Sequence, residues 1–337
     1  MNSQGLRSEL IDRAAQHRRL ELGELSDKAY AELRSAVAAD PEAFLTRDDD
    51  RAFAMVVRAV AANEEAQASE ELIDDDEAFN AARNKRLDRL YDRCEQAFQT
   101  FPGTYDALAM MAMVRSTEPD VALEKLRYVQ SGHADAVAEA RRVGGIPEVE
   151  VPEGADAWEV ADERPKLRLL SSIARAQAET GRYRHACETC ERIVKASPSD
   201  MTCARYTWTI CLARLEEEAA FDELDARFGR QGNAWTHLAR TLLLFKLGRM
   251  PAARRALKGY ASLCRGGAYA LLRPTFVEPY LPDRPTFTPG SYEEAMLAVH
   301  ECDPIVMDTP DFLAWASAQD GFSEQARQFA RDNDYDW

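Results

Sequence analysis

Residues 164–198, RPKLRLLSSIARAQAETGRYRHACETCERIVKASP, predict two helices joined by a tight turn at Gly181-Arg182-Tyr183. Pro198 is expected to end the second helix. A pair of this kind cannot bury both of its apolar faces alone, so it needs neighbouring pairs stacked on either side, as in an α-solenoid. The apolar residues recur at the spacing of one helix face and are Leu167, Leu170, Ile173, Ala174, Ala186, Cys190, Ile193 and Val194.

The same pattern continues after Pro198. Residues 201–214 and 219–228 predict one further pair, and residues 235–247 begin the next, whose second helix follows Pro251. Gly248 lies 67 residues after Gly181 (248 minus 181), close to twice the period of about 34 residues of tetratricopeptide repeats. We therefore predict an all-α fold, a right-handed α-solenoid of antiparallel helix pairs.

Two parts flank the predicted repeats. We expect N-terminal helices over residues 1–75, tetratricopeptide-like helical repeats over 76–265, and a Pro-rich extended segment with C-terminal helices packed on the solenoid over 266–337. Five prolines between 273 and 290 favour extended backbone. Because this strap also carries Phe276, Tyr280 and Phe287, it is too apolar for a flexible linker, and we expect it to be ordered.

Three shorter segments carry local predictions. The loop over 144–165 contains Trp158, which we expect to lie against an apolar surface. Ser291 and Glu294 form the pattern of a capping box, so a helix should begin there. The acidic-aromatic end, residues 332–337, is expected to be loose.

The net charge of the chain limits the kinds of partner that it can bind. The chain has 42 Lys and Arg against 58 Asp and Glu, a net charge of −16. Such a surface repels phosphate backbones and acidic membrane surfaces, so we expect neither nucleic acid nor a membrane as partner. The N-terminal residues lack the apolar region of a signal peptide, and no apolar run approaches the roughly 20 residues that span a bilayer. We expect a cytoplasmic protein.

A family likeness rests on the same residues. Gly181, Tyr183, Ala186 and Pro198 resemble the tetratricopeptide consensus, whereas Cys190 and Ile193 depart from it. Residues 94–315 resemble the suppressor-of-tumorigenicity-seven family and its bacterial relatives. The resemblance implies a helical-repeat fold and a binding role, and it supplies no catalytic residues. The stretches that carry it are 163–165, 181–183, 197–200, 205–206, 234–235, 242–245, 277–281 and 290–295.

The sharpest metal candidate is the set His185, Cys187 and Cys190, with Cys203 and Cys211 as further candidate ligands. Zinc requires four ligands that converge in a tetrahedron. Cys187 and Cys190 share a helix face, but Cys190 occupies a packing position of the repeat, which favours buried structural thiols. The sequence contains no Gly-rich phosphate loop and no recognisable nucleophile–base set. We predict no catalytic residues and no cofactor, and keep a metal-binding or enzymatic regulator as the alternative.

The remaining candidate is a groove on the concave face, which the first helix of each pair lines in tetratricopeptide-like repeats. Arg168, Arg175 and Arg205, with Trp208 and Trp235, are predicted to face it. Arginines can bind a carboxylate or phosphate with two parallel hydrogen bonds. Alternatively, these arginines pair with neighbouring acids. We predict a non-catalytic scaffold that binds a protein or peptide partner, and self-association into a homodimer stays open.

Overall fold

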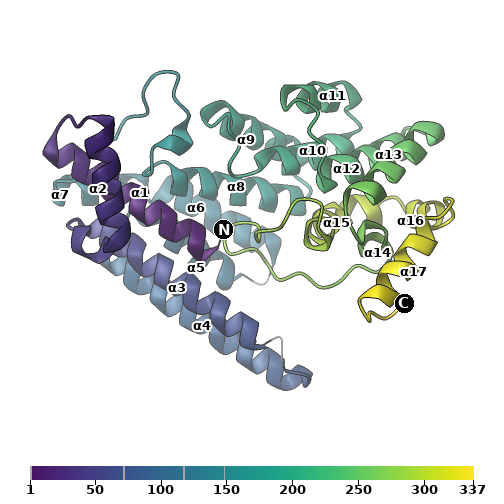
Figure 1. The fold of residues 1–337 in the computed structure, drawn as a ribbon, viewed down its shortest axis with the longest axis horizontal. Coiled ribbons are helices and arrows are strands. Elements are labelled where there is room, and N and C mark those ends of the chain that lie inside the picture. Colours follow the sequence, from purple (N-terminus) through teal and green to yellow (C-terminus); the bar gives the residue numbers. More distant parts are fainter. Residues whose placement is uncertain (1, 71–72, 117, 148) are drawn as a thin grey trace. The chain divides into compact units, whose positions relative to one another are not determined.

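A computed structural model describes residues 2–70, 73–116, 118–147 and 149–337, and Figure 1 labels its helices. Within these residues it contains seventeen α-helices, two short 3-10 helices and no strand. The predicted all-α fold class is confirmed. No helix in the described ranges combines the length and the apolar character that crossing a membrane requires.

The chain divides into two compact units. Unit 1 comprises Met1–Ala176 with Ala196–Thr202 and Tyr280–Pro285, and unit 2 comprises Gln177–Lys195, Cys203–Pro279 and Thr286–Trp337. The predicted boundaries at 75/76 and 265/266 do not coincide with this division. The physical reason is that α3 and α4, on either side of residue 75, pack against each other along their lengths.

Unit 1 is a set of helices around an apolar core. The core gathers Leu6 and Leu10 of α1, Phe53 of α3, Leu90 of α4 and Met110 of α5. Its elements are α1 (Ser3–Leu22), α2 (Asp27–Ala39), η1 (Pro41–Phe44), α3 (Asp48–Glu70), α4 (Asp76–Thr100), α5 (Tyr105–Val114), α6 (Pro119–Gly132), α7 (Ala134–Val143), η2 (Ala157–Glu159) and most of α8 (Arg164–Glu179).

Unit 2 contains the helices that follow. First helices of successive hairpins lie side by side, since α10 packs on α12 and α12 on α15. Its largest fully buried side chains are Trp235, Tyr260, Phe221, Phe312, Leu238 and Leu242. Its helices are α9 (Tyr183–Ala196), α10 (Ala204–Leu215), α11 (Glu218–Arg227), α12 (Ala234–Lys246), α13 (Met250–Leu263), α14 (Gly267–Leu272), α15 (Tyr292–Met307), α16 (Phe312–Ser317) and α17 (Phe322–Asp332).

The same turn closes three hairpins. Gly181, Glu216 and Gly248 each have a left-handed backbone, with φ of 74°, 62° and 70°. Each donates its N–H to the carbonyl three residues back, and the next residue donates to the carbonyl five residues back, which is the Schellman pattern. Their spacings are 35 residues (216 minus 181) and 32 residues (248 minus 216). The structure thus adds Glu216 to the two glycine turns predicted from the sequence.

The helix start at Ser291 is confirmed in detail. The Ser291 hydroxyl accepts a hydrogen bond from the Glu294 N–H, 3.3 Å away. The buried Glu294 carboxylate accepts from the N–H groups of Gly290 and Ala234, at 2.6 and 2.7 Å. This side chain therefore ties the start of α15 to the start of α12.

The loop over 144–165 and the Pro-rich strap both pack against helices. Trp158 of the 144–165 loop lies beneath the guanidinium groups of Arg164 and Arg168, at 5.6 and 5.8 Å from its ring centre. Gln16 of α1 exchanges hydrogen bonds with the Glu159 carbonyl and the Ala161 N–H. The strap is ordered too, since Leu281 packs on the core of unit 1.

The C-terminal end is packed rather than loose, which corrects our expectation. Trp337 lies under the guanidinium groups of Arg273 and Arg327, at 5.5 and 5.7 Å. The Tyr269 hydroxyl donates to the Asp336 carbonyl, and the Tyr335 ring lies 5.6 Å from the Tyr269 ring. Aromatic and cation–π contacts thus hold these residues within unit 2.

Candidate functional site

Arg168, predicted to face an open groove, lies inside unit 1. It is 1% exposed, and its guanidinium binds two carboxylates. Its hydrogen bonds to Glu9 measure 2.7 and 2.9 Å, and those to Asp106 measure 2.8 and 2.6 Å. All of its donor nitrogens face acids, so Arg168 is corrected from a partner-binding to a structural residue. The acids are distant in sequence, whereas the alternative had expected neighbouring ones.

Arg175 is also buried, and its partner is the strap. Its guanidinium donates a hydrogen bond to the Pro282 carbonyl, which also accepts one from the Ser172 hydroxyl at 3.0 Å. The same guanidinium lies over the Tyr280 ring, 5.6 Å from its centre. Unit 1 therefore holds an extended, Pro-containing segment by one backbone carbonyl and one aromatic ring.

Unit 2 holds the next part of the strap through an aromatic stack. Trp235 is 0% exposed; Tyr206 stacks on it at 4.5 Å and Phe287 covers it at 5.2 Å. Arg205 lies over the rings of Phe228 and Tyr206, at 4.7 and 5.3 Å. Trp208, half-buried, is the remaining residue of the predicted groove. Phe287 of the same chain therefore packs against Trp235, and Trp235 does not face solvent as predicted.

The predicted metal set does not converge. His185 is exposed on α9, Cys187 is half-buried and Cys190 is buried. Contact with the Cys187 thiol, together with burial, raises the pKa of Cys211 well above its ordinary value. Among the described residues, potential ligand atoms come together at a different place, in unit 1.

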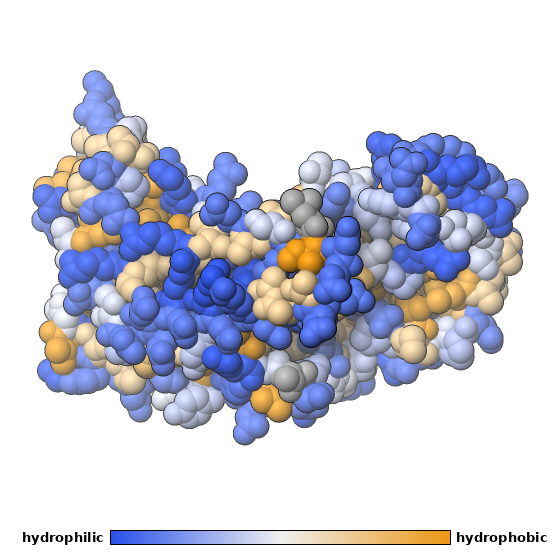
Figure 2. Space-filling view, turned by 90° about the horizontal axis from the view of Figure 1, so that it is seen from below, coloured by the Kyte–Doolittle hydropathy of each residue, from blue (hydrophilic) through white to orange (hydrophobic). Residues whose placement is uncertain are grey.

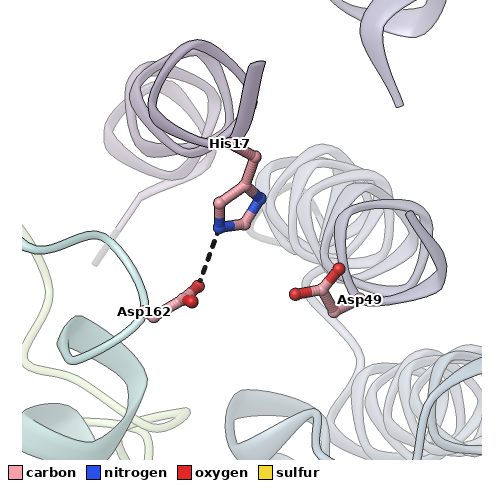
Figure 3. A group of neighbouring side chains, drawn as sticks. All are labelled: His17, Asp49 and Asp162. Carbon is pink, nitrogen blue, oxygen red and sulfur yellow. Dashed lines mark ion pairs between the residues drawn. The ribbon is translucent and has the colours of Figure 1, made fainter. Parts of the chain in front are cut away.

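That place is the cluster of His17, Asp49 and Asp162, which come from α1, α3 and the loop before α8 (Figure 3). His17 is buried, with Nδ1 2.8 Å from Asp50 and Nε2 3.2 Å from Asp162. Arg13 binds Asp162 at 3.0 Å, and Arg141 lies 3.5 Å from its other oxygen. A small cavity of about 20 Å³ adjoins the cluster, which is room for about one water molecule.

The electrostatics favour a protonated His17. Burial lowers its pKa, but hydrogen bonds to Asp162 and Asp50 outweigh burial and raise it. Burial raises the pKa of Asp162, but the His17 hydrogen bond and the charge of Arg13 hold it far below its ordinary value. Both ring nitrogens of His17 face carboxylates, so each can donate only when the ring is an imidazolium.

Charge counting leads to the same assignment. Five basic and five acidic side chains form ion pairs in and near this cluster; eight are buried, and Arg47 and Arg141 are half-buried. Their formal charges are equal in number when His17 is protonated. A metal ion would need a neutral imidazole and would displace the arginines that already bind the carboxylates. These residues do not fit a metal site. The members are Arg13, His17, Arg47, Arg141, Arg168, Glu9, Asp49, Asp50, Asp106 and Asp162.

Sequence reasoning missed this network, although a signal for it exists. Arg13 and His17 continue the face of α1 that begins with Leu6 and Leu10, at the three- and four-residue spacing of a buried stripe. Charged residues on an apolar stripe indicate buried ion pairs. Their partners were not identifiable, because Asp162 lies 149 residues from Arg13 in the sequence.

The chain was compared with protein families, curated proteins and solved structures. The chain matches no protein-family model, no curated protein and no solved structure.

Proposed function

We propose that the protein is a non-catalytic scaffold that binds extended, Pro-containing segments of a protein partner, in the way that each unit now holds part of its own strap. The observation that carries the proposal is the pair of strap contacts. In unit 1, Arg175 and Ser172 both donate to the Pro282 carbonyl. In unit 2, Phe287 lies against Trp235.

The chemistry of these contacts suits peptide recognition. A prolyl carbonyl is a good acceptor in extended backbone, and an aromatic surface recognises the side chain that follows. Backbone recognition supplies affinity for many sequences, and the aromatic surface around Trp235 and Tyr206 selects among them. The chain's own residues 280–287 would then compete with a partner segment for the same contacts.

The arrangement of the helices supports a tetratricopeptide-like solenoid as the framework. Three hairpins close with the same Schellman turn at intervals of 35 and 32 residues, which bracket the period of about 34 residues. The helices α10, α12 and α15 pack as neighbours. Such repeats commonly present an extended binding surface.

The test is binding in trans of a fluorescein-labelled synthetic peptide with the sequence of residues 276–290, followed by fluorescence anisotropy. The double variant Tyr280→Ala, Phe287→Ala loosens the internal strap. We expect it to bind the peptide about tenfold more tightly than the wild-type chain, because an attached segment competes at an effective concentration of about a millimolar.

Phe276→Ala is the matched control, since Phe276 is an aromatic residue of the same strap that is 73% exposed. We expect it to leave the affinity for the peptide unchanged, and a scrambled peptide to bind neither protein. Equal affinity of the wild-type chain and the double variant, with both folded by circular dichroism, would contradict the proposal.

A further inference from the structure

A second surface lies on α3 and α4 of unit 1 and does not depend on the function proposed above. In Figure 1 these two helices run side by side as a long hairpin. A groove of about 310 Å³ opens between them. One wall carries small residues of α3, Ala59, Ala62 and Ala66, and the other carries Arg86, Arg89 and Arg93 of α4.

The spacing explains why the groove exists. Both sets follow the same interval, three and then four residues, so each set lies on one face of its helix. Alanine side chains are too short to fill the space between two packed helices, and the long arginines line it. Apolar and cationic surface are therefore combined in one recess.

The three arginines differ in their partners. Arg86 is buried and bound to Glu70 at 2.8 Å and to Asn63 at 3.1 Å. Arg89 and Arg93 are exposed, and among the residues that the structure describes neither forms a hydrogen bond or an ion pair. They lie one turn apart, where like charges repel each other.

The two exposed arginines contrast with the charge of the whole chain. The chain carries a net charge of −16, and among the described residues the lining of the groove includes one carboxylate, Glu65. The face of the molecule in Figure 2 is mostly hydrophilic, with hydrophobic side chains in small separate patches. Charge complementarity, rather than a large apolar area, is therefore the chemistry by which a partner would recognise such a surface.

We propose that this arginine groove binds an acidic peptide segment of a protein partner, with Arg89 and Arg93 each binding one glutamate. Two guanidinium groups one helical turn apart match two carboxylates one turn apart on a partner helix. Guanidinium binds carboxylate with two parallel hydrogen bonds, and the alanine wall accommodates the aliphatic part of each glutamate. A long polyanion suits the groove less well, because the rest of the acidic surface repels it.

The test uses an alanine-based helical peptide with glutamates spaced four residues apart, labelled with fluorescein, and the same peptide with glutamines. We expect the wild-type chain to bind the glutamate peptide and not the glutamine peptide. The double variant Arg89→Gln, Arg93→Gln should bind the glutamate peptide at least about tenfold more weakly, as expected for lost charge-assisted hydrogen bonds.

Lys85→Gln is the matched control for Arg93→Gln, because it removes one exposed positive charge from α4 outside the groove. We expect Lys85→Gln to change the affinity less than twofold and Arg93→Gln clearly more, a difference that nonspecific attraction would not produce. The variants alter exposed residues, and their circular dichroism spectra should match that of the wild-type chain.

Three results would overturn the proposal. The wild-type chain could fail to bind the glutamate peptide, or Lys85→Gln could weaken binding as much as Arg93→Gln. A single-stranded RNA oligonucleotide that binds more tightly than the glutamate peptide, and loses affinity in the double variant, would assign the groove to nucleic acid instead.

Discussion

The interiors of the two units are built from different chemistry. Unit 1 buries eight charged side chains in ion pairs around Arg168 and His17, with Arg47 and Arg141 half-buried beside them. Unit 2 buries mostly apolar side chains of repeated hairpins, with Trp235 and Leu242 among the most buried. An ion network fixes one arrangement of its elements, because a misplaced charge loses its partner at high cost. An apolar stripe can instead recur from one hairpin to the next, so that further hairpins can be added to the stack.

This difference also separates what the sequence could predict from what it could not. The hairpins of unit 2 follow from local signals, the apolar spacing and the glycines at 181 and 248. Arg168 was misplaced in our prediction because its partners Glu9 and Asp106 lie 159 and 62 residues away. Arg175 and Trp235 were expected to face a groove, and the strap that covers them is distant in sequence. Long-range pairing of charges has no periodicity that one sequence reveals.

The largest expected effect breaks the network of unit 1. Arg168→Met should leave Glu9 and Asp106 buried without their shared cation, and reduce the free energy of unfolding by about 3–5 kcal/mol. Urea denaturation followed by circular dichroism measures it. The control is Arg184→Met, which removes an exposed pair with Glu217 and should change stability little. Equal effects of the two variants would remove the distinction between the units.

The next effect tests the apolar interior of unit 2. Leu242 of α12 is fully buried, so Leu242→Ala should cost about 2–5 kcal/mol through lost burial and a residual cavity. Leu242→Met conserves volume and should cost less than about 1.5 kcal/mol. Thermal unfolding of the three proteins gives the comparison. If Leu242→Met were as damaging as Leu242→Ala, lost volume would not account for the cost of Leu242→Ala.

A smaller effect tests the repeated turn. Gly248 has φ of 70°, and the space that a methyl group would occupy there is open. Gly248→Ala should therefore cost about 1–2 kcal/mol through backbone strain and not through a clash. Gly248→Asn should cost less, since asparagine tolerates this conformation. The same pair of substitutions at Gly181 should give similar values by thermal unfolding. A neutral Gly248→Ala would contradict the assigned turn.

The smallest effect is the pH dependence of unit 1. The folded-state pKa of His17 is raised above its ordinary value, so its contribution to stability is complete below about pH 6.5 and is lost as the pH rises through the folded pKa. Urea unfolding from mildly acidic to alkaline pH should show this loss in the wild-type chain and much less of it in His17→Gln. Parallel pH profiles of the two proteins would mean that His17 carries no linked proton.

The central claim is that the strap occupies the place of a partner segment. A crystal structure of the Tyr280→Ala, Phe287→Ala variant with the peptide of residues 276–290 tests it most directly. We predict that the prolyl carbonyl of the peptide accepts hydrogen bonds from Ser172 and Arg175, and that its phenylalanine lies against Trp235. A peptide bound elsewhere on the molecule, with these three side chains free of it, would contradict the account.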